Sequence, residues 1–371
     1  MNDSCQNWHI IRRPMITKQK KKRTPMPQSV LPAYGLKEEL LTMETFGSGL
    51  INRTWKITTA DQQYILQRVN HAIFENPDSI AHNIRLIARY LKKHHPDYCF
   101  VAPLASSDGS EMIFVKEEGF FRLFPFMDGS HSKDVVDCPE QAYEAARQFG
   151  RFTRMLSGVD VTKLKITIPS FHDLSLRYRQ FLQALEMGNA QRRESSHLLV
   201  DELFACNDIV TQYEAIKNNP AFKLRVTHHD TKISNVLFDE ANKGMCVIDL
   251  DTVMPGYFIS DVGDMMRTYL SPVSEEERDF SKIVVREDYY KSLVDGYYAE
   301  MKDELTDAEK GCFFYAGKFM IYMQALRFFT DHLNNDVYYG AQYEGHNLVR
   351  AQNQVVLLQR LLEKETRLAS F

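Results

Sequence analysis

The sequence predicts an α+β fold in two lobes, a small β-rich N-terminal lobe followed by a larger, mainly helical C-terminal lobe. Residues 40–126 carry several short runs of strand-forming residues around a single helical pattern, which is typical of a small sheet with one helix. From residue 139 onward, apolar residues recur mostly at helical spacing. We therefore expect three parts: a basic tail over 1–28, a nucleotide-binding lobe over 29–129 and a catalytic lobe over 130–371.

The first lobe is predicted to hold five strands and one helix. The strands are runs rich in β-branched and aromatic residues, predicted over 40–46, 54–59, 64–69, 111–116 and 120–126. The helix is predicted over 77–95, because Pro77 and Asp78 are typical of a first helical turn and Ile80 and Ile84 follow at helical spacing. The last strand leads into a connector that contains Gly129.

Amphipathic helices dominate the second lobe. The clearest is predicted over 140–156, where the apolar residues form one stripe. The segments 171–218 and 287–333 are also predicted to be mostly helical, and a last helix carries Leu348 and Leu362 on one face. Short strands interrupt this pattern around 235–250. The stretch 255–264 contains Pro and Gly residues and is predicted to be rich in turns.

Composition and charge disfavour several classes of protein. The 371 residues are 44% hydrophobic and 25% charged, as in globular proteins, and the net charge of -4 disfavours a dedicated nucleic-acid-binding protein. The six cysteines include no C-x-x-C pair, so we expect reduced thiols. No apolar run approaches the roughly 20 residues of a membrane span. With no secretory signal either, we expect a cytoplasmic protein and a solvated basic tail.

The most informative segment is His228-His229-Asp230-Thr231-Lys232-Ile233-Ser234-Asn235, which has the pattern H-x-D-x-x-x-x-N. An apolar strand end with two carboxylates, Ile248-Asp249-Leu250-Asp251, follows it. Phosphoryl transfer from a nucleotide needs a carboxylate at the acceptor hydroxyl, an Asn that binds magnesium and a further metal-binding Asp. Because Asp230, Asn235 and Asp249 provide these groups, the motifs predict a phosphotransferase.

Residues around these three have predicted supporting roles. Lys232 is expected to neutralise charge on the transferring group, or else to lie in solvent. Asp251, on the same strand face as Asp249, is expected to bind a second ion, a water or the acceptor, or to cap the strand. His228 is interpreted as a buried scaffold rather than a zinc ligand, since adjacent histidines on an extended segment point apart. Asp261 is predicted to accept hydrogen bonds from N–H groups of the 228–235 segment.

The first lobe offers candidates for binding the nucleotide. Gly47-Ser48-Gly49 lies between two predicted strands, where glycines let N–H groups approach phosphate oxygens; an ordinary hairpin turn is the alternative. Arg68 is expected to pair with the α and β phosphates, or to be a solvated residue of an edge strand. The adenine is expected to lie against the connector that begins at Phe126 and Met127.

Together these motifs resemble those of the aminoglycoside phosphotransferase and choline kinase superfamily. H-x-D-x-x-x-x-N, I-D-x-D, a Gly/Pro turn and a later Asp occur in the order typical of that superfamily, and the likeness covers about residues 40–370. The resemblance implies a protein-kinase-like fold, ATP as the phosphoryl donor and Mg²⁺ as the cofactor.

Within this superfamily the sequence is most similar to the bacterial N-acetylhexosamine 1-kinases. The similarity rests on the strings at 47–52, 65–70, 171–178, 248–256 and 346–351. It implies that ATP phosphorylates the anomeric hydroxyl of N-acetylglucosamine or N-acetylgalactosamine. By the same resemblance, Arg327 and Tyr338 or Tyr339 are expected to bind the sugar, and the catalytic motifs add Asp230 and Asp251 as groups expected to contact it.

Two alternatives stay open at this point. The same fold can phosphorylate another small hydroxyl acceptor such as choline, an aminoglycoside or homoserine. A nucleotide-binding scaffold without catalysis is the other alternative, although it would have no need of Asp230, Asn235 and Asp249 together. The sequence predicts a small-molecule substrate and no membrane or nucleic-acid partner, and it leaves the oligomeric state undetermined.

Overall fold

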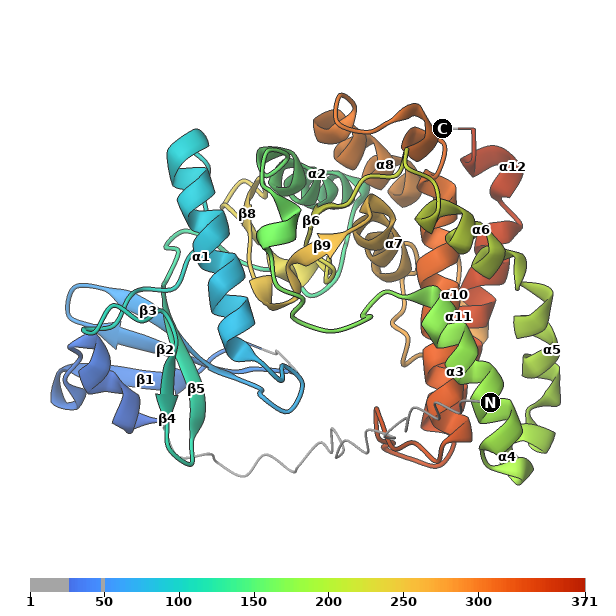
Figure 1. The fold of residues 1–371 in the computed structure, drawn as a ribbon, viewed down its shortest axis with the longest axis horizontal. Helices are drawn as coiled ribbons and strands as arrows, with labels where there is room; N and C mark the ends of the chain where they lie inside the picture. Colours follow the sequence, from blue (N-terminus) through green and yellow to red (C-terminus); the bar gives the residue numbers. More distant parts are fainter. Residues whose placement is uncertain (1–26, 48–50, 371) are drawn as a thin grey trace, which may run out of the picture.

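The computed structural model describes residues 27–47 and 51–370 and has the predicted two-lobed α+β architecture (Figure 1). The N-terminal lobe contains an antiparallel sheet in the order β1-β2-β3-β5-β4. All five strands predicted for this lobe are present, together with its one α-helix. The elements are η1 (Gln28–Tyr34), η2 (Glu38–Leu40), β1 (Leu41–Thr45), β2 (Arg53–Thr59), β3 (Gln63–Val69), α1 (Pro77–His94), β4 (Ile113–Val115) and β5 (Gly119–Pro125).

The two faces of this sheet are covered differently. On the outer face, Leu66 and Phe121 are buried against Val30 of η1. On the inner face, Val69 is buried with Ile84 of α1, and α1 lies between the sheet and the C-terminal lobe (Figure 1). Because side chains alternate between faces along a strand, this arrangement decides which side chains of β3 and β5 are directed toward the C-terminal lobe.

Helix α1 is attached to the C-terminal lobe through Asn83, whose side chain is fully buried. Its Nδ2 donates to the carbonyl oxygens of Lys165 (2.8 Å) and Val253 (2.9 Å). Its Oδ1 accepts from the N–H of Lys165 (2.8 Å). Since buried polar groups need partners, one side chain here fixes three backbone groups of the other lobe.

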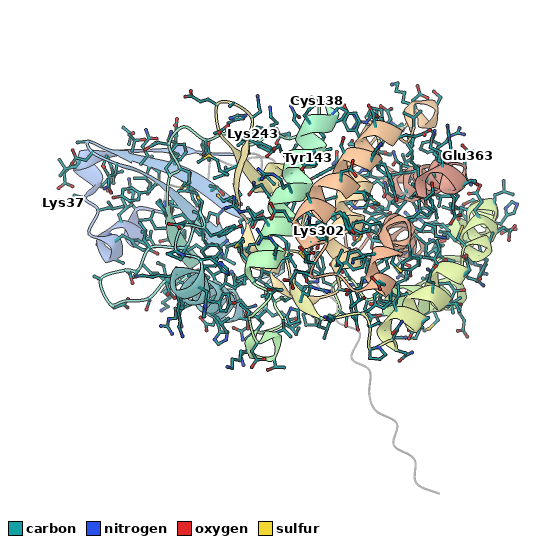
Figure 2. The ribbon with its side chains drawn as sticks, turned by 90° about the horizontal axis from the view of Figure 1, so that it is seen from above. Lys37, Cys138, Tyr143, Lys243, Lys302 and Glu363 are labelled. Carbon is teal, nitrogen blue, oxygen red and sulfur yellow. The ribbon has the colours of Figure 1, made fainter. Side chains whose placement is uncertain are left out.

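The C-terminal lobe is built around α10, which packs against α3, α7 and α11. Helices α2 and α8 run side by side (Figure 2), and Gly296 lets the backbone of α8 approach that of Tyr143. The helices are α2 (Pro139–Met155), α3 (Leu174–Met187), α4 (Ala190–Ser195), α5 (His197–Ala205), α6 (Asp208–Lys217), α7 (Phe258–Tyr269), α8 (Glu287–Met301), α9 (Asp307–Lys310), α10 (Phe313–Leu333), α11 (His346–Leu362) and α12 (Glu365–Leu368). Among the described helices, none is both long and apolar enough to cross a bilayer.

Two small strand pairs bracket the predicted catalytic segment. Strand β6 (Arg225–Thr227) pairs with β9 (Met254–Gly256), and β7 (Val236–Phe238) pairs with β8 (Gly244–Val247). The turn-rich prediction for 255–264 was wrong for most of its length, because α7 begins at Phe258. Gly263, part of the stretch predicted to be rich in turns, lies inside α7, where a Cβ atom would collide with the Ala316 carbonyl of α10. Close helix packing explains this glycine.

The chain crosses between the lobes at the connector that follows β5. The N–H of Phe126 still donates to the Gln63 carbonyl of β3 (3.0 Å). His131 and Phe238 of β7 then exchange two backbone hydrogen bonds, of 2.9 and 2.8 Å. In between, the Ser130 hydroxyl donates to the Met127 carbonyl (2.6 Å). The connector is therefore anchored to a strand at each end.

Candidate active site

The H-x-D-x-x-x-x-N segment follows β6 and is held by Asp261 of α7. The two carboxylate oxygens of Asp261 accept hydrogen bonds from the N–H groups of His228 (2.9 Å) and His229 (2.7 Å). His229 has a left-handed backbone (φ 66°), an uncommon conformation for a residue that is not glycine. A fully buried carboxylate thus holds a sharp turn immediately before Asp230, which is the structural role expected for Asp261.

The buried ring of His228 also supports this turn. Its ring is fully buried edge-on against Phe149, and its Nε2 lies 2.9 Å from the carbonyl oxygen of Ile248. Burial lowers its pKa, so the ring is neutral. A neutral ring that donates from Nε2 leaves Nδ1 to accept the N–H of Asp230 (3.4 Å). The interactions of His228 are those of the buried scaffold that the sequence predicted.

Further anchors from α7 were not predicted. The Asp264 carboxylate accepts a hydrogen bond from the N–H of Thr231 (2.8 Å), and the Tyr269 hydroxyl donates to the Thr231 carbonyl (2.7 Å). Asp264 is also paired with Arg267 at 2.9 Å. Asp261 and Asp264 are three residues apart, a spacing that places both on one face of a helix. Because 255–264 was predicted to be rich in turns, this spacing was not used.

Asp230, Lys232 and Asn235 lie together after this turn. Lys232 Nζ is 3.0 Å from Asp230 Oδ1, and Asn235 Nδ2 is 3.1 Å from Asp230 Oδ2. Burial tends to raise the pKa of Asp230, but the Lys232 ammonium and the hydrogen bond from Asn235 outweigh it, so the pKa lies below its ordinary value. Asp230 is therefore ionised at neutral pH and able to accept a proton.

Asp249 and Asp251 differ from the prediction in their local structure. Strand β8 ends at Val247, so the two residues do not share a strand face. Asp249 is instead left-handed (φ 60°) and begins the short helix η5 (Leu250–Thr252), which contains Asp251. Although Asp249 has an exposed surface, enclosure by protein and the carboxylates of Asp251 and Asp230 raise its pKa to about 7. The turn thus concentrates negative charge.

The cation that balances this charge was not predicted from the sequence. Arg122, in the middle of β5, places Nη1 2.5 Å from Asp251 Oδ1. Asn52, just before β2, donates from Nδ2 to Asp251 Oδ2 (2.7 Å). An arginine in an otherwise apolar strand was the available signal for Arg122.

The structure does not place Arg68 as we expected. Arg68 pairs with Phe121 across the sheet, so its side chain shares the outer face with Phe121, near Gly119 and Glu118. Its neighbour Gln67 pairs with Arg122 on the inner face. The cation that β3 and β5 direct toward the acidic residues is therefore Arg122, and Arg68 lies on the opposite side of the sheet.

The other groups expected at the nucleotide are partly described. Gly47 follows β1 with a left-handed backbone (φ 76°) and has open space where a Cβ would lie, whereas Ser48 and Gly49 fall outside the described residues. At the connector, the Phe126 ring lies 4.1 Å from Lys56 Nζ and edge-on to Phe46. The backbone N–H of Phe126 is already engaged by β3, as described above.

Three of the residues expected at the acceptor lie on α10 or in the loop that follows it: Arg327, Tyr338 and Tyr339. Arg327 of α10 lies over the rings of Phe171 (5.7 Å) and Tyr339 (5.6 Å). The Asp331 carboxylate accepts hydrogen bonds from the N–H groups of Tyr338 (2.7 Å) and Tyr339 (2.8 Å) and fixes the loop after α10. Tyr338 itself is exposed. Arg327 and Tyr339 thus share one wall, with Tyr338 at its edge.

This wall continues to the catalytic segment through His172. The His172 ring stacks on Phe171 (4.4 Å) and lies 5.2 Å from the ring of His229, the residue before Asp230. Arg177 lies nearby, and burial together with the Arg327 guanidinium lowers its pKa to about 10. Among the described residues, no carboxylate forms an ion pair with Arg177 or Arg327. The wall therefore carries two unneutralised cations.

The donor groups fit a magnesium ion that is bound together with a nucleotide. Both hydrogen bonds of the Asn235 side chain use its nitrogen, which leaves its oxygen available. The exposed carboxylate of Asp249 is the second oxygen donor. In the described part of the chain, no group of three or more His, Cys, Asp or Glu residues is arranged for a metal. Mg²⁺ commonly takes one or two protein oxygens and completes its shell with water and phosphate.

The chain is similar to known proteins in sequence and in fold. The chain matches the phosphotransferase enzyme family (APH) over residues 42–283. Solved structures with the same fold include the microcompartment-associated aminopropanol kinase, at 16% identity over 92% of this chain and 98% of that one, with a TM-score of 0.62. A choline/ethanolamine kinase family protein from Mesorhizobium loti is 16% identical over 92% and 96%, with a TM-score of 0.57.

Spectinomycin phosphotransferase, in complex with ADP and spectinomycin, is 12% identical over 91% of this chain and 97% of that chain, with a TM-score of 0.57. These identities establish a shared fold. The family match spans the N-terminal sheet, the H-x-D-x-x-x-x-N segment, Asp249 and α7. It covers more than half of the sequence, and the chain therefore belongs to the phosphotransferase enzyme family.

Proposed function

We propose that the protein is an ATP- and Mg²⁺-dependent kinase that phosphorylates the anomeric hydroxyl of an N-acetylhexosamine to give the sugar 1-phosphate. The observation that carries phosphoryl transfer is the ionised Asp230 carboxylate, held by a buried scaffold and flanked by Lys232 and Asn235. Support for the acceptor comes from the wall formed by Phe171, Arg327 and Tyr339, together with the sequence resemblance.

In this proposal Asp230 accepts the proton of the anomeric hydroxyl while that oxygen forms a bond to the γ-phosphorus. The bond from the γ-phosphorus to the bridging oxygen breaks, and ADP leaves. Lys232 would neutralise charge on the transferring phosphoryl group, and Asn235 and Asp249 would provide the oxygens that hold Mg²⁺. The bound ion would supply charge neutralisation on the phosphates. Catalysis of this type rests mainly on positioning and on fixed charges.

ATP is proposed as the donor because of the fold and the charge pattern. The spectinomycin phosphotransferase with this fold binds ADP. In this chain, the connector at Phe126 and Met127 would contact the adenine, and the Gly47 turn would lie near the phosphates. Enclosure by protein, together with the carboxylates of Asp251 and Asp230, raises the pKa of Asp249. A cation bound with the nucleotide would relieve this repulsion.

The charge of the wall favours an uncharged acceptor. Arg177 and Arg327 would repel the cationic groups of choline or an aminoglycoside, whereas hydroxyl and acetamide oxygens accept hydrogen bonds from guanidinium groups. An aromatic cage for choline could draw on Tyr297 of α8 together with Tyr338 and Tyr339, but Tyr297 is fully buried and packs edge-on against Phe313 of α10. These observations support a sugar over a quaternary ammonium compound.

The test is an ADP-release assay with ATP and Mg²⁺ against a panel of acceptors. The panel holds N-acetylglucosamine, N-acetylgalactosamine, other hexoses, choline, homoserine, aminopropanol and kanamycin. We expect turnover on an N-acetylhexosamine, an acid-labile and alkali-stable product phosphate, and no turnover on the methyl glycoside, whose anomeric oxygen is blocked. Turnover only on another acceptor would retain the catalytic assignment and replace the substrate.

A substitution of Arg327 tests whether the wall binds the sugar. Arg327→Met should raise the KM for the sugar about 10- to 100-fold, because a hydrogen bond to a charged group contributes about 1.5–3 kcal/mol. The KM for ATP should stay near its wild-type value. Arg327→Lys should not restore the sugar KM, since lysine lacks the planar fork of donors. An unchanged sugar KM in Arg327→Met would remove this residue from the acceptor site.

A further inference from the structure

A buried cluster joins the N-terminal lobe to Asp251, and the mechanism above does not use it. The ion pair between Arg122 and Asp251 leaves only 1% and 2% of the two side-chain surfaces exposed. The second carboxylate oxygen of Asp251 accepts the hydrogen bond from Asn52. Both oxygens of Asp251 are thus engaged by groups of the other lobe.

The two N-terminal groups are held in place by their own lobe. Arg122 donates from Nε (3.2 Å) and Nη2 (2.9 Å) to Gln67 Oε1 on the neighbouring strand, and its guanidinium lies 5.0 Å from the centre of the Phe124 ring. Asn52 accepts the N–H of Asn70 on its Oδ1 (3.0 Å). Each group therefore bridges the sheet and Asp251, and neither is free to reorient without losing a buried contact.

We propose that Asn52, Arg122 and Asp251 form an interlobe clasp that positions Asp249 against the nucleotide, and that Asp251 acts as a positioning residue and not as a metal ligand. Asp249 begins the short helix η5 that contains Asp251, so holding one fixes the other. The proposal rests on nucleotide-dependent transfer and is independent of the acceptor.

The contrast between the two aspartates supports this division of roles. Asp251 is buried, and its oxygens have partners on Arg122 and Asn52. Asp249 is exposed, and no hydrogen bond to its carboxylate is made by the described residues. A ligand for a cation that arrives with a nucleotide must be accessible and free of competing partners, and Asp249 meets both conditions among the described residues. A carboxylate in a buried ion pair is suited to fixing geometry.

The experiment uses Arg122→Met, Asp251→Leu and the double variant of the full chain. Thermal melting and the calorimetric affinity for Mg·ADP are measured for each. Each single variant leaves one buried polar partner uncompensated and should lower Tm by several degrees. The double variant should recover most of the Tm, because an apolar pair can replace a buried ion pair. Its Mg·ADP affinity should stay about 10- to 100-fold weak, because directional positioning is lost.

Arg122→Met also separates the two roles of Asp251. If Asp251 were a metal ligand, freeing its carboxylate from Arg122 would leave Mg·ADP binding unchanged or tighter, whereas the clasp predicts weaker binding. The matched control is Arg85→Met, which breaks the partly exposed ion pair of α1 with Glu111 and should change the affinity by less than about twofold.

Two results would overturn the proposal. One is a double variant that regains both Tm and Mg·ADP affinity, which would show that the ion pair stabilises the fold without positioning Asp249. The other is unchanged or tighter Mg·ADP binding by Arg122→Met, which would support Asp251 as a metal ligand instead. Failure of the wild-type protein to bind Mg·ADP would instead overturn the nucleotide-dependent function, and the role of the clasp with it.

Discussion

The two halves of the site are anchored in different ways. The Asp230 turn is held within the C-terminal lobe by Asp261 and its neighbours on α7. The Asp249 turn is held across the lobes, through Arg122 and through the bond of Asn83 to Val253. Both turns contain a left-handed residue that isolated chains avoid, so each needs external support. The proton-accepting half therefore depends on one lobe, and the cation-binding half depends on how the two lobes sit together.

The strongest test of the first half is Asp230→Asn. The variant should fold normally and lose about 10²–10⁴-fold in kcat/KM, because a positioned general base is removed while its scaffold stays intact. Steady-state kinetics with ATP and the sugar provide the measurement, with Glu240→Gln, an exposed acid of the adjacent hairpin, as the control. Near-wild-type turnover would remove Asp230 from the role of base.

Removal of the scaffold tests the claim that the C-terminal lobe alone holds the turn. Asp261→Ala leaves two buried N–H groups unpaired and should lower the free energy of unfolding by about 2–4 kcal/mol. Urea denaturation measures this loss, and Asp295→Ala on the exposed side of α8 is the matched control. Equal stability of the two variants would show that the turn before Asp230 does not depend on α7.

Asn83→Ala tests whether α1 supports the cation-binding half of the site. The loss of three buried hydrogen bonds should reduce the free energy of unfolding by about 1–3 kcal/mol and raise the KM for ATP, because the Val253 segment loses its attachment to the N-terminal lobe. Arg89→Ala, an exposed change on the same helix, should do neither. A rise in the sugar KM with no change for ATP would contradict the assignment of this anchor to the nucleotide side.

The pH dependence of the cation-binding half gives the smallest effect. Because the pKa of Asp249 is raised to about 7, activity that needs its carboxylate should rise with pH through about 7, and excess Mg²⁺ should move this limb to lower pH by competing with the proton. Because the folded pKa is raised, the contribution of Asp249 to stability is full below its unfolded pKa of about 4 and is lost as the pH rises through about 7. Asp249→Asn should therefore be roughly 1 kcal/mol more stable than wild type at pH 8, after allowing for solvent screening.

Urea melts of the wild type and Asp249→Asn at pH 5 and pH 8 check the stability, and rate profiles at two Mg²⁺ concentrations check the activity. An acid limb that stays at one pH at all Mg²⁺ concentrations would separate it from metal binding. A variant less stable than wild type at pH 8 would show that Asp249 is not under repulsion from its neighbours.

Sequence reasoning worked where one segment contains the whole signal. The strands of the N-terminal lobe and the H-x-D-x-x-x-x-N segment are local patterns, and they lie where they were predicted. It failed where the deciding partner is distant in the chain. The role of Arg122 depends on its ion pair with Asp251, and the need for glycine at position 263 depends on the close approach of the Ala316 carbonyl. For Arg68, both faces of β3 are partly covered, so alternation did not reveal which side chains point inward.

The backbone bridge between His131 and Phe238 has a mechanical consequence. It attaches the N-terminal lobe to the C-terminal lobe at the end of the connector, and the contact of Arg122 with Asp251 attaches it a second time. The hydrogen bonds of Asn83 in α1 to Lys165 and Val253 attach the N-terminal lobe a third time. We expect any rocking of this lobe during nucleotide exchange to break at least one of the three attachments, while the acceptor wall stays still.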